Sequence, residues 1–183
     1  GVSLVAVGDH TGYLTNPEGF NSHRLQQYVA KNGSIAGYAN GTAITREQFF
    51  GSAADIFIPA ALENQIGPGE AEALQVKLVA EGANGPCSPE GEIILRRKNI
   101  EVLPDVLANA GGVTVSYYEW VQNKRSETWT IEEVDERLER AMIEAYDRME
   151  QFAELHKCDY RIACYGVALE RLKKVYEERE IFP

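Results

Sequence analysis

Residues 104–123 read Pro104-Asp105-Val106-Leu107-Ala108-Asn109-Ala110-Gly111-Gly112-Val113-Thr114-Val115-Ser116-Tyr117-Tyr118-Glu119-Trp120-Val121-Gln122-Asn123. Proline followed by aspartate is a favourable helix start, because proline lacks the N–H that a first turn cannot use. Inside the helical pattern, Gly111 and Gly112 each cost about 1 kcal/mol relative to alanine. That cost predicts a close approach to the backbone, either by a ligand or by another helix or sheet of the protein.

Segments typical of buried strands alternate with helical segments on the N-terminal side of this stretch. The predicted strands are residues 2–7, 34–38, 54–59, 77–81 and 100–103, and the predicted helices start near residues 20, 46, 68 and 89. This alternation predicts an α/β fold with a Rossmann-like, doubly wound, mostly parallel sheet. Residues 2–7 would start the chain in mid-sheet, which indicates a fragment or missing preceding residues.

Two long helices are predicted after the sheet. Thr130 and Glu133 form a capping-box pattern at the start of an amphipathic helix, and residues 159–178 give a second helix. We therefore expect a partial dinucleotide-binding domain over residues 1–125 and a C-terminal helical extension over residues 126–183.

Polar or small residues follow several predicted strands, at Asp9, Ala60-Ala61, Asn84 and Asn109. Ligands of parallel sheets bind outside the carboxyl ends of the strands. A carboxylate there can accept hydrogen bonds from ribose hydroxyls, small residues admit a flat group, and an amide can both donate and accept. Each position also fits an ordinary turn. Their coincidence at one predicted edge favours a binding site.

Composition excludes several classes of function. The chain has 183 residues and a net charge of -10, which argues against nucleic-acid binding through a basic face. No apolar run approaches the ~20 residues of a membrane span. The three cysteines form no CxxC pattern and the three histidines are scattered, so we expect reduced thiols, a cytoplasmic location and no metal site.

Three segments resemble the glutamate/leucine/phenylalanine/valine dehydrogenase family, and within it the glutamate enzymes. They are residues 59–66 (PAALENQI), residues 79–86 (VAEGANGP) and the stretch 104–123 quoted above. The segments are long and occur in the family's order and spacing. The resemblance covers essentially this whole chain, but only the C-terminal half of the family's polypeptide.

The resemblance implies reversible oxidative deamination of L-glutamate to 2-oxoglutarate and ammonia, with hydride transfer to NAD or NADP. It places Asp9 at the adenosine ribose, Ala60 and Ala61 at the adenosine side, and Asn84 near the nicotinamide ribose and carboxamide. Asn109 would bridge nicotinamide and substrate. The substrate side would be formed by Gly111, Gly112, Val113 and Ser116.

Ser116 favours glutamate, because a hydroxyl can hydrogen-bond the γ-carboxylate, whereas relatives that use aliphatic amino acids look apolar there. The alternatives are a leucine, valine or phenylalanine dehydrogenase, and a non-catalytic fragment that only assembles or binds nucleotide weakly. Asp9 favours NAD, because its charge would repel a 2′-phosphate. His10 and Thr11 could nevertheless accommodate the phosphate of NADP.

The sequence departs from the family pattern in two ways. The glycine-rich phosphate loop of the first strand–helix unit does not occur, so the sheet is expected to lack that unit. The lysines and aspartate that activate the substrate belong to the family's N-terminal substrate domain, so no catalytic residue is expected here and the chain alone should be inactive. Family members are commonly hexamers, and an exposed sheet edge would favour self-association.

Overall fold

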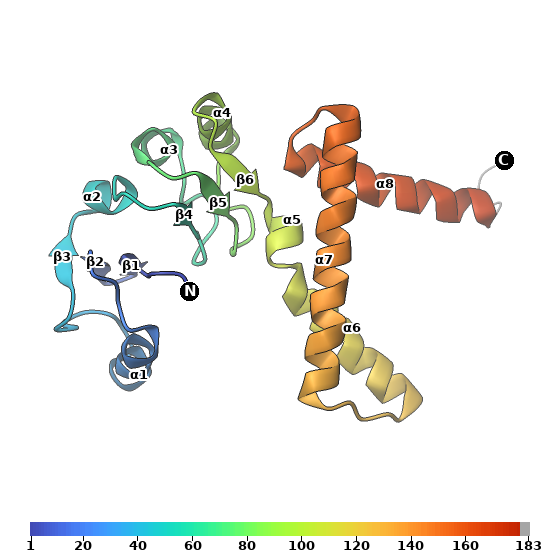
Figure 1. Cartoon of the computed structure of the whole chain (residues 1–183), viewed down its shortest axis with the longest axis horizontal. Coiled ribbons are helices and arrows are strands. Elements are labelled where there is room, and N and C mark those ends of the chain that lie inside the picture. Colours follow the sequence, from blue (N-terminus) through green and yellow to red (C-terminus); the bar gives the residue numbers. More distant parts are fainter. Residues whose placement is uncertain (180–183) are drawn as a thin grey trace. The chain divides into compact units, whose positions relative to one another are not determined.

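The structure is a computed structural model that describes residues 1–179 (Figure 1). The chain divides into two compact units. The first consists of Gly1–Phe57, Ala61–Val79 and Pro86–Glu101. The second consists of Ile58–Ala60, Ala80–Gly85 and the described residues from Val102 onward. Residues 180–183, at the end of the predicted helical extension, lie outside the described residues. The expected division near residue 125 remains a proposal about domains.

A three-stranded antiparallel sheet stands at the start of the first unit. Its order is β1 (Ala6–Asp9), β2 (Gly12–Thr15), β3 (Thr42–Ile44). Asp9 pairs with Gly12, so only two residues connect β1 to β2, a connection that can join antiparallel strands but not parallel ones. The predicted parallel strand over residues 2–7 is therefore wrong. Val2 is 92% exposed, whereas a strand in a doubly covered sheet would bury it.

One apolar cluster holds the sheet and the first helix of this unit together. Helix α1 (Ser22–Asn32) is capped by Asn21 and ends at Gly33, whose φ of 80° suits glycine. The predicted strand over residues 34–38 is wrong, because this segment forms turns that direct two apolar side chains inward. The cluster consists of Leu14, Phe20, Leu25, Ile35 and Tyr38.

A short sheet with parallel pairing follows, in the order β4 (Ile56–Phe57), β5 (Leu78–Ala80), β6 (Glu101–Leu103). Helix α2 (Arg46–Phe50) precedes β4, and α3 (Pro68–Ala73) and α4 (Pro89–Arg97) connect the strands. All three start near the predicted residues, and Thr45 and Ser88 cap α2 and α4. The α/β class is confirmed. Within residues 1–179 the sheet has three strands and β1 is not among them, so the full doubly wound sheet is not formed.

Helices dominate the second unit. They are α5 (Asp105–Ala108), α6 (Ala110–Arg125), α7 (Ile131–His156) and α8 (Tyr160–Glu178). The long C-terminal helices are confirmed, including the capping box at Thr130. α7 and α8 pack closely, since a Cβ on Gly166 would lie 2.3 Å from the Phe152 ring. The buried residues of this unit include Leu107, Met149, Ala153 and Ala163.

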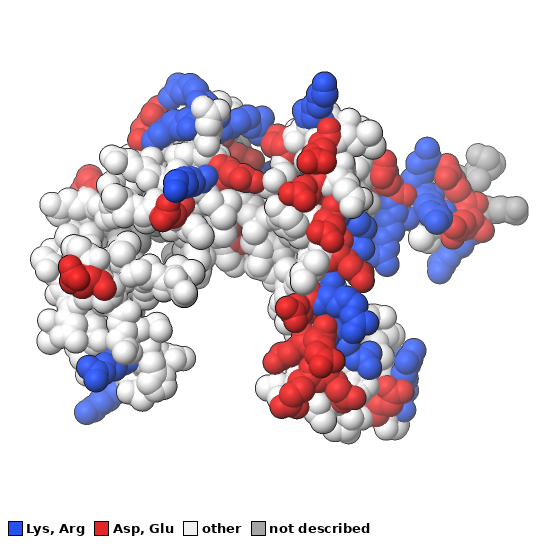
Figure 2. Space-filling model, in the orientation of Figure 1, with Lys and Arg blue, Asp and Glu red and all other residues white. Residues whose placement is uncertain are grey.

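The surfaces of the long helices are highly charged. Figure 2 shows acidic side chains gathered along α7 with basic side chains between them, and Arg148 and Glu144 form an exposed pair at 3.7 Å. None of the helices within residues 1–179 has the length and apolar character needed to cross a bilayer. All three cysteines are free thiols.

Candidate functional site

Two side-chain amides meet in the second unit. Asn109 donates from Nδ2 to Oδ1 of Asn84 at 2.7 Å, and the same nitrogen lies 3.4 Å from the carbonyl oxygen of Gly82. Asn84 lies in the loop after β5, and Asn109 lies between α5 and α6. The structure thus brings together the two amides that the sequence placed beyond separate strands.

Asn109 occupies a break in what the sequence predicted as one continuous helix. Its φ and ψ of -103° and 3° end α5 and begin α6, and its side chain makes no capping hydrogen bond. Asparagine at such a position usually caps the following helix. Here the amide reaches the β5 loop instead, so its orientation is set by the Asn84 contact.

The loop that carries Asn84 packs closely against the end of β4. Ala83 donates from its backbone nitrogen to the Pro59 carbonyl oxygen at 2.8 Å. A Cβ on Gly82 would lie 3.2 Å from the Cβ of Ala60. The two segments can therefore approach this closely only because both residues are small. Ala60, expected at the adenosine side, therefore adjoins the Asn84 loop, and Ala61 follows it in the chain.

An ion-pair cluster adjoins this loop, because the backbone nitrogen of Gly85 donates to Asp105. Glu81 is fully buried, and Arg161 of α8 donates from Nη2 to its Oε2 at 2.7 Å. Arg161 also donates from Nη1 to Oδ1 of Asp105 at 3.0 Å. The sequence interpretation missed all three residues. The acidic residue at the end of the predicted strand 77–81 was a usable signal, but nothing local indicated its partner 80 positions away.

Asp105 keeps its charge through several contacts. Burial alone would raise the pKa of this carboxyl. Backbone N–H groups of Gly85 and Val106 and the guanidinium of Arg161 outweigh burial, and the pKa of Asp105 falls below its usual value. The carboxylate is therefore ionised at neutral pH and holds both the Gly85 backbone and Arg161.

The expected substrate residues lie along α6. Gly111, Gly112, Val113 and Ser116 occupy its first two turns, and Val113 is 70% exposed. Gly112, Val113 and Ser116 share one side of the helix by their spacing of three and four residues. Within residues 1–179, a Cβ placed on Gly112 would meet no heavy atom within 4 Å beyond its chain neighbours and the nearby backbone of α6, so packing does not explain this glycine.

Asp9 lies in the first unit, at the end of β1. Its Oδ1 accepts hydrogen bonds from the backbone nitrogen and hydroxyl of Thr11, and its Oδ2 accepts from the backbone nitrogen of Ile35. Burial opposes ionisation, but these hydrogen bonds lower the pKa of Asp9 below its usual value. The expected place at the end of a parallel strand is wrong, because β1 pairs antiparallel. Its role towards a ribose stays a prediction.

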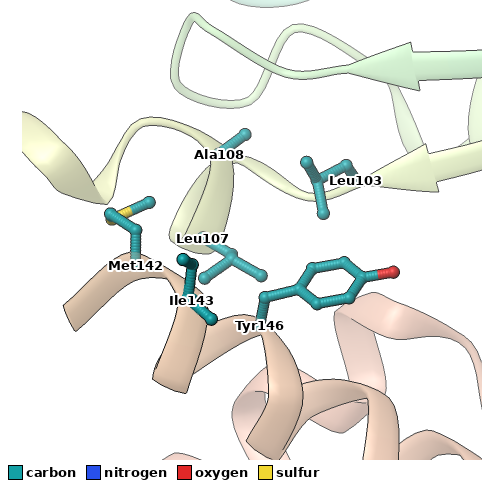
Figure 3. Close-up of a pocket in the computed structure, with 6 residues that line it drawn as sticks. All are labelled: Leu103, Leu107, Ala108, Met142, Ile143 and Tyr146. Atoms are coloured by element: carbon teal, nitrogen blue, oxygen red, sulfur yellow. The ribbon is translucent and has the colours of Figure 1, made fainter. Parts of the chain in front are cut away.

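An apolar cavity of about 300 Å³ lies elsewhere in the second unit (Figure 3). Figure 3 shows Leu107 of α5 pointing towards Ile143 and Tyr146 of α7. The Tyr146 hydroxyl lies 3.2 Å from Oε1 of Glu150. The cavity thus offers an apolar surface and little polar chemistry. The lining residues are Leu103, Leu107, Ala108, Met142, Ile143 and Tyr146.

Comparisons with known proteins bear on the whole chain. The family model described as Glutamate/Leucine/Phenylalanine/Valine dehydrogenase matches residues 1–180. A glutamate dehydrogenase of Thermotoga maritima is 43% identical over 183 residues, which are 100% of this chain and 44% of that protein. NADP-specific glutamate dehydrogenase A1 and NAD-specific glutamate dehydrogenase A of Halobacterium salinarum are each 37% identical, over 100% of this chain and 44% and 42% of theirs.

The fold of this chain also matches a solved glutamate dehydrogenase structure. The hetero-hexameric glutamate dehydrogenase of Thermus thermophilus, in a leucine-bound form, matches with a TM-score of 0.89 and 32% identity. The match covers 99% of this chain and 42% of that chain. The chain therefore spans less than half the length of the relatives that it matches.

Proposed function

Because this chain belongs to the glutamate/leucine/phenylalanine/valine dehydrogenase family, as its C-terminal, Rossmann portion, we propose that it is the nucleotide-binding part of a glutamate dehydrogenase. The complete enzyme would convert L-glutamate reversibly to 2-oxoglutarate and ammonia with NAD or NADP. The substrate-activating groups would lie in the N-terminal domain of the family's polypeptide, and this chain alone would be inactive.

The hydrogen bond between Asn84 and Asn109 is the observation that carries the proposal. It places two amides next to the start of α6, where the backbone at Gly112 meets no other described side chain. A nicotinamide carboxamide needs both a donor and an acceptor, and paired amides supply both. An amino acid substrate could approach the backbone closely at Gly112, because glycine has no Cβ.

The cofactor would extend from this pair along small residues. Ala60 and Gly82 are exposed and carry at most a methyl, so a flat group could lie against their backbone. Asn84 and Asn109 would hold the nicotinamide of a bound cofactor, which would supply the hydride acceptor for the reaction. The residues of this chain would bind the two reactants and orient them towards each other. Such orientation lowers the activation barrier, because the reactants are already held in the reacting geometry.

Ser116 supports glutamate as the substrate. It is exposed one turn beyond Val113, where its hydroxyl can donate to a γ-carboxylate. Burying that carboxylate against an apolar side chain would cost several kcal/mol on the scale of unpaired polar groups. A leucine, valine or phenylalanine dehydrogenase is the second candidate, and Ser116 disfavours it. A fragment that only assembles or binds nucleotide weakly is the third.

Asp9 supports NAD over NADP, because an acidic side chain would repel the 2′-phosphate. The two Halobacterium relatives differ in cofactor at equal identity, so overall similarity does not choose between them. We also propose a homo-oligomer, in line with the short sheets of the first unit, whose edges could pair with a second copy. Sedimentation velocity of the full-length protein would test this, and a monomer would contradict it.

A substrate panel tests the proposed function. The full-length enzyme is assayed with L-glutamate, L-leucine, L-valine and L-phenylalanine, each with NAD and NADP. We expect the kcat/KM of glutamate with NAD to exceed every other combination. Faster oxidation of leucine would support the second candidate. Saturable NADH binding without turnover of any amino acid would support the third.

A further inference from the structure

We propose that Arg161 is a positioning residue that sets the relative placement of Asn84 and Asn109. It would act through Glu81 and Asp105, the two carboxylates that it bridges. The inference rests on the proposed function and adds to it a residue of α8, a helix that carries none of the expected ligand contacts.

The guanidinium joins two segments that are distant in sequence. Arg161 donates from Nη2 to Oε2 of Glu81 at 2.7 Å and from Nη1 to Oδ1 of Asp105 at 3.0 Å. Glu81 directly follows β5 and Asp105 opens α5. The planar, forked guanidinium fixes both carboxylates in one geometry, as a single point charge would not.

Each carboxylate in turn holds backbone that leads to one of the amides. Glu81 Oε2 accepts from the Asp105 backbone nitrogen at 2.9 Å, and Asp105 Oδ2 accepts from the Gly85 backbone nitrogen at 2.8 Å. Gly85 directly follows Asn84. The Asp105 carbonyl oxygen accepts from the backbone nitrogen of Asn109 at 3.1 Å. The amide pair is thus connected to Arg161 from both sides.

Glu81 depends on Arg161 for its placement. Its side chain is 0% exposed, and the contacts described for it converge on Oε2. Oε1 has no hydrogen-bond partner within residues 1–179. A buried carboxylate that loses its cation is strongly destabilised, so the β5 loop would shift to expose it. A shift of about 1 Å at a reacting site can lower the rate by up to about a hundredfold.

Four variants of the full-length enzyme test this role. Arg161→Met removes the guanidinium, and Arg161→Lys keeps the charge without its forked geometry. The double variant Glu81→Gln/Arg161→Met removes the buried carboxylate charge together with its cation. Arg171→Met is the matched control, because Arg171 is exposed on the same helix. The measurements are the unfolding temperature, kcat with glutamate, and the isotope effect on kcat with glutamate deuterated at Cα.

We expect Arg161→Met to lower kcat by about tenfold. We also expect a larger isotope effect, because hydride transfer from a misplaced substrate then limits turnover. The double variant should regain the unfolding temperature but not kcat, and Arg161→Lys should fall between. Arg171→Met should match the wild type. Loss of folded enzyme alone would lower kcat without changing the isotope effect.

Two results would overturn the inference, and they are distinguishable. A wild-type enzyme that forms no NAD(P)H from glutamate would refute the proposed function, and the inference with it. An active wild type whose Arg161→Lys and double variants keep normal kcat and isotope effect would refute only the positioning role. Arg161 would then be a structural partner of Glu81.

Discussion

Asn84 and Asn109 stand 25 positions apart in the sequence, yet Nδ2 of Asn109 lies 2.7 Å from Oδ1 of Asn84. One amide follows β5 and the other separates α5 from α6, so their contact joins the end of a strand to the start of a helix. The backbone of α6 is accessible one turn beyond this contact, at Gly112. The proposed site is built on this junction.

Replacing Gly112 with alanine should change stability and activity in opposite directions. The added methyl meets open space in the fold, and alanine stabilises a helix by about 1 kcal/mol relative to glycine. The same methyl would obstruct an amino acid lying against the backbone, so the KM for glutamate should rise. Urea unfolding and steady-state kinetics of the full-length enzyme measure the two effects. An unchanged KM would remove Gly112 from the substrate site.

Ser116→Val should change substrate preference. Loss of the hydroxyl leaves the γ-carboxylate of glutamate without a donor, whereas valine offers an apolar contact to leucine. We expect kcat/KM for glutamate to fall by about ten- to a hundredfold, on the scale of one hydrogen bond to a charged group. The ratio of kcat/KM for glutamate to that for leucine is the measurement, with Ser22→Val, exposed in the first turn of helix α1, as the control. Unchanged glutamate kinetics would contradict the assignment.

Asp105→Asn should alter the dependence of stability on pH. Because the folded pKa of Asp105 is lowered, its contribution is fully present above the usual value near 4 and is lost as pH falls through the folded pKa. The variant should therefore be less stable by about 2 kcal/mol at pH 7 and should lose less on acidification. Urea midpoints between pH 7 and pH 3 measure this. Asp147→Asn, exposed on α7, is the control and should follow the wild type.

Cys164 should resist alkylation in the folded enzyme. Burial raises the pKa of its thiol to about 11, so the reactive thiolate is scarce at pH 8. We expect iodoacetamide labelling roughly 200-fold slower than in denaturant, from the ratio at pH 8 of thiolate fractions for pKa values near 11 and 8.5. Peptide mass spectrometry reads the rate. Labelling at the denatured rate in folded enzyme would contradict the assigned burial.

Local signals predicted helix boundaries well. Helix α4 starts at the predicted Pro89, and Thr130 caps α7 as expected, because these signals depend on residues only a few positions apart. The same local view failed at β1. An apolar run predicts a buried strand but does not identify the strand that pairs with it. Here the partner is β2, which follows β1 after a two-residue turn and pairs antiparallel.

Contacts between residues distant in the sequence could not be predicted from local patterns. The break at Asn109 depends on the β5 loop, so the helical pattern of residues 104–123 read as continuous. Arg161 looked like one of many charged residues on an amphipathic helix. Its partner Glu81 is 80 positions away, and only the fold shows that this carboxylate is buried. Asn84 and Asn109 were found because both follow predicted strands.

Fluorescence titration with NADH tests the central claim most directly, using the full-length wild type, Asn109→Ala and Asn123→Ala. Asn123 is exposed near the far end of α6 and serves as the control. We expect saturable binding by the wild type and the control, and a Kd about tenfold higher for Asn109→Ala, on the scale of one lost hydrogen bond. Equal affinity in all three proteins, or no saturable binding by the wild type, would contradict the assignment of the Asn84–Asn109 junction to the cofactor.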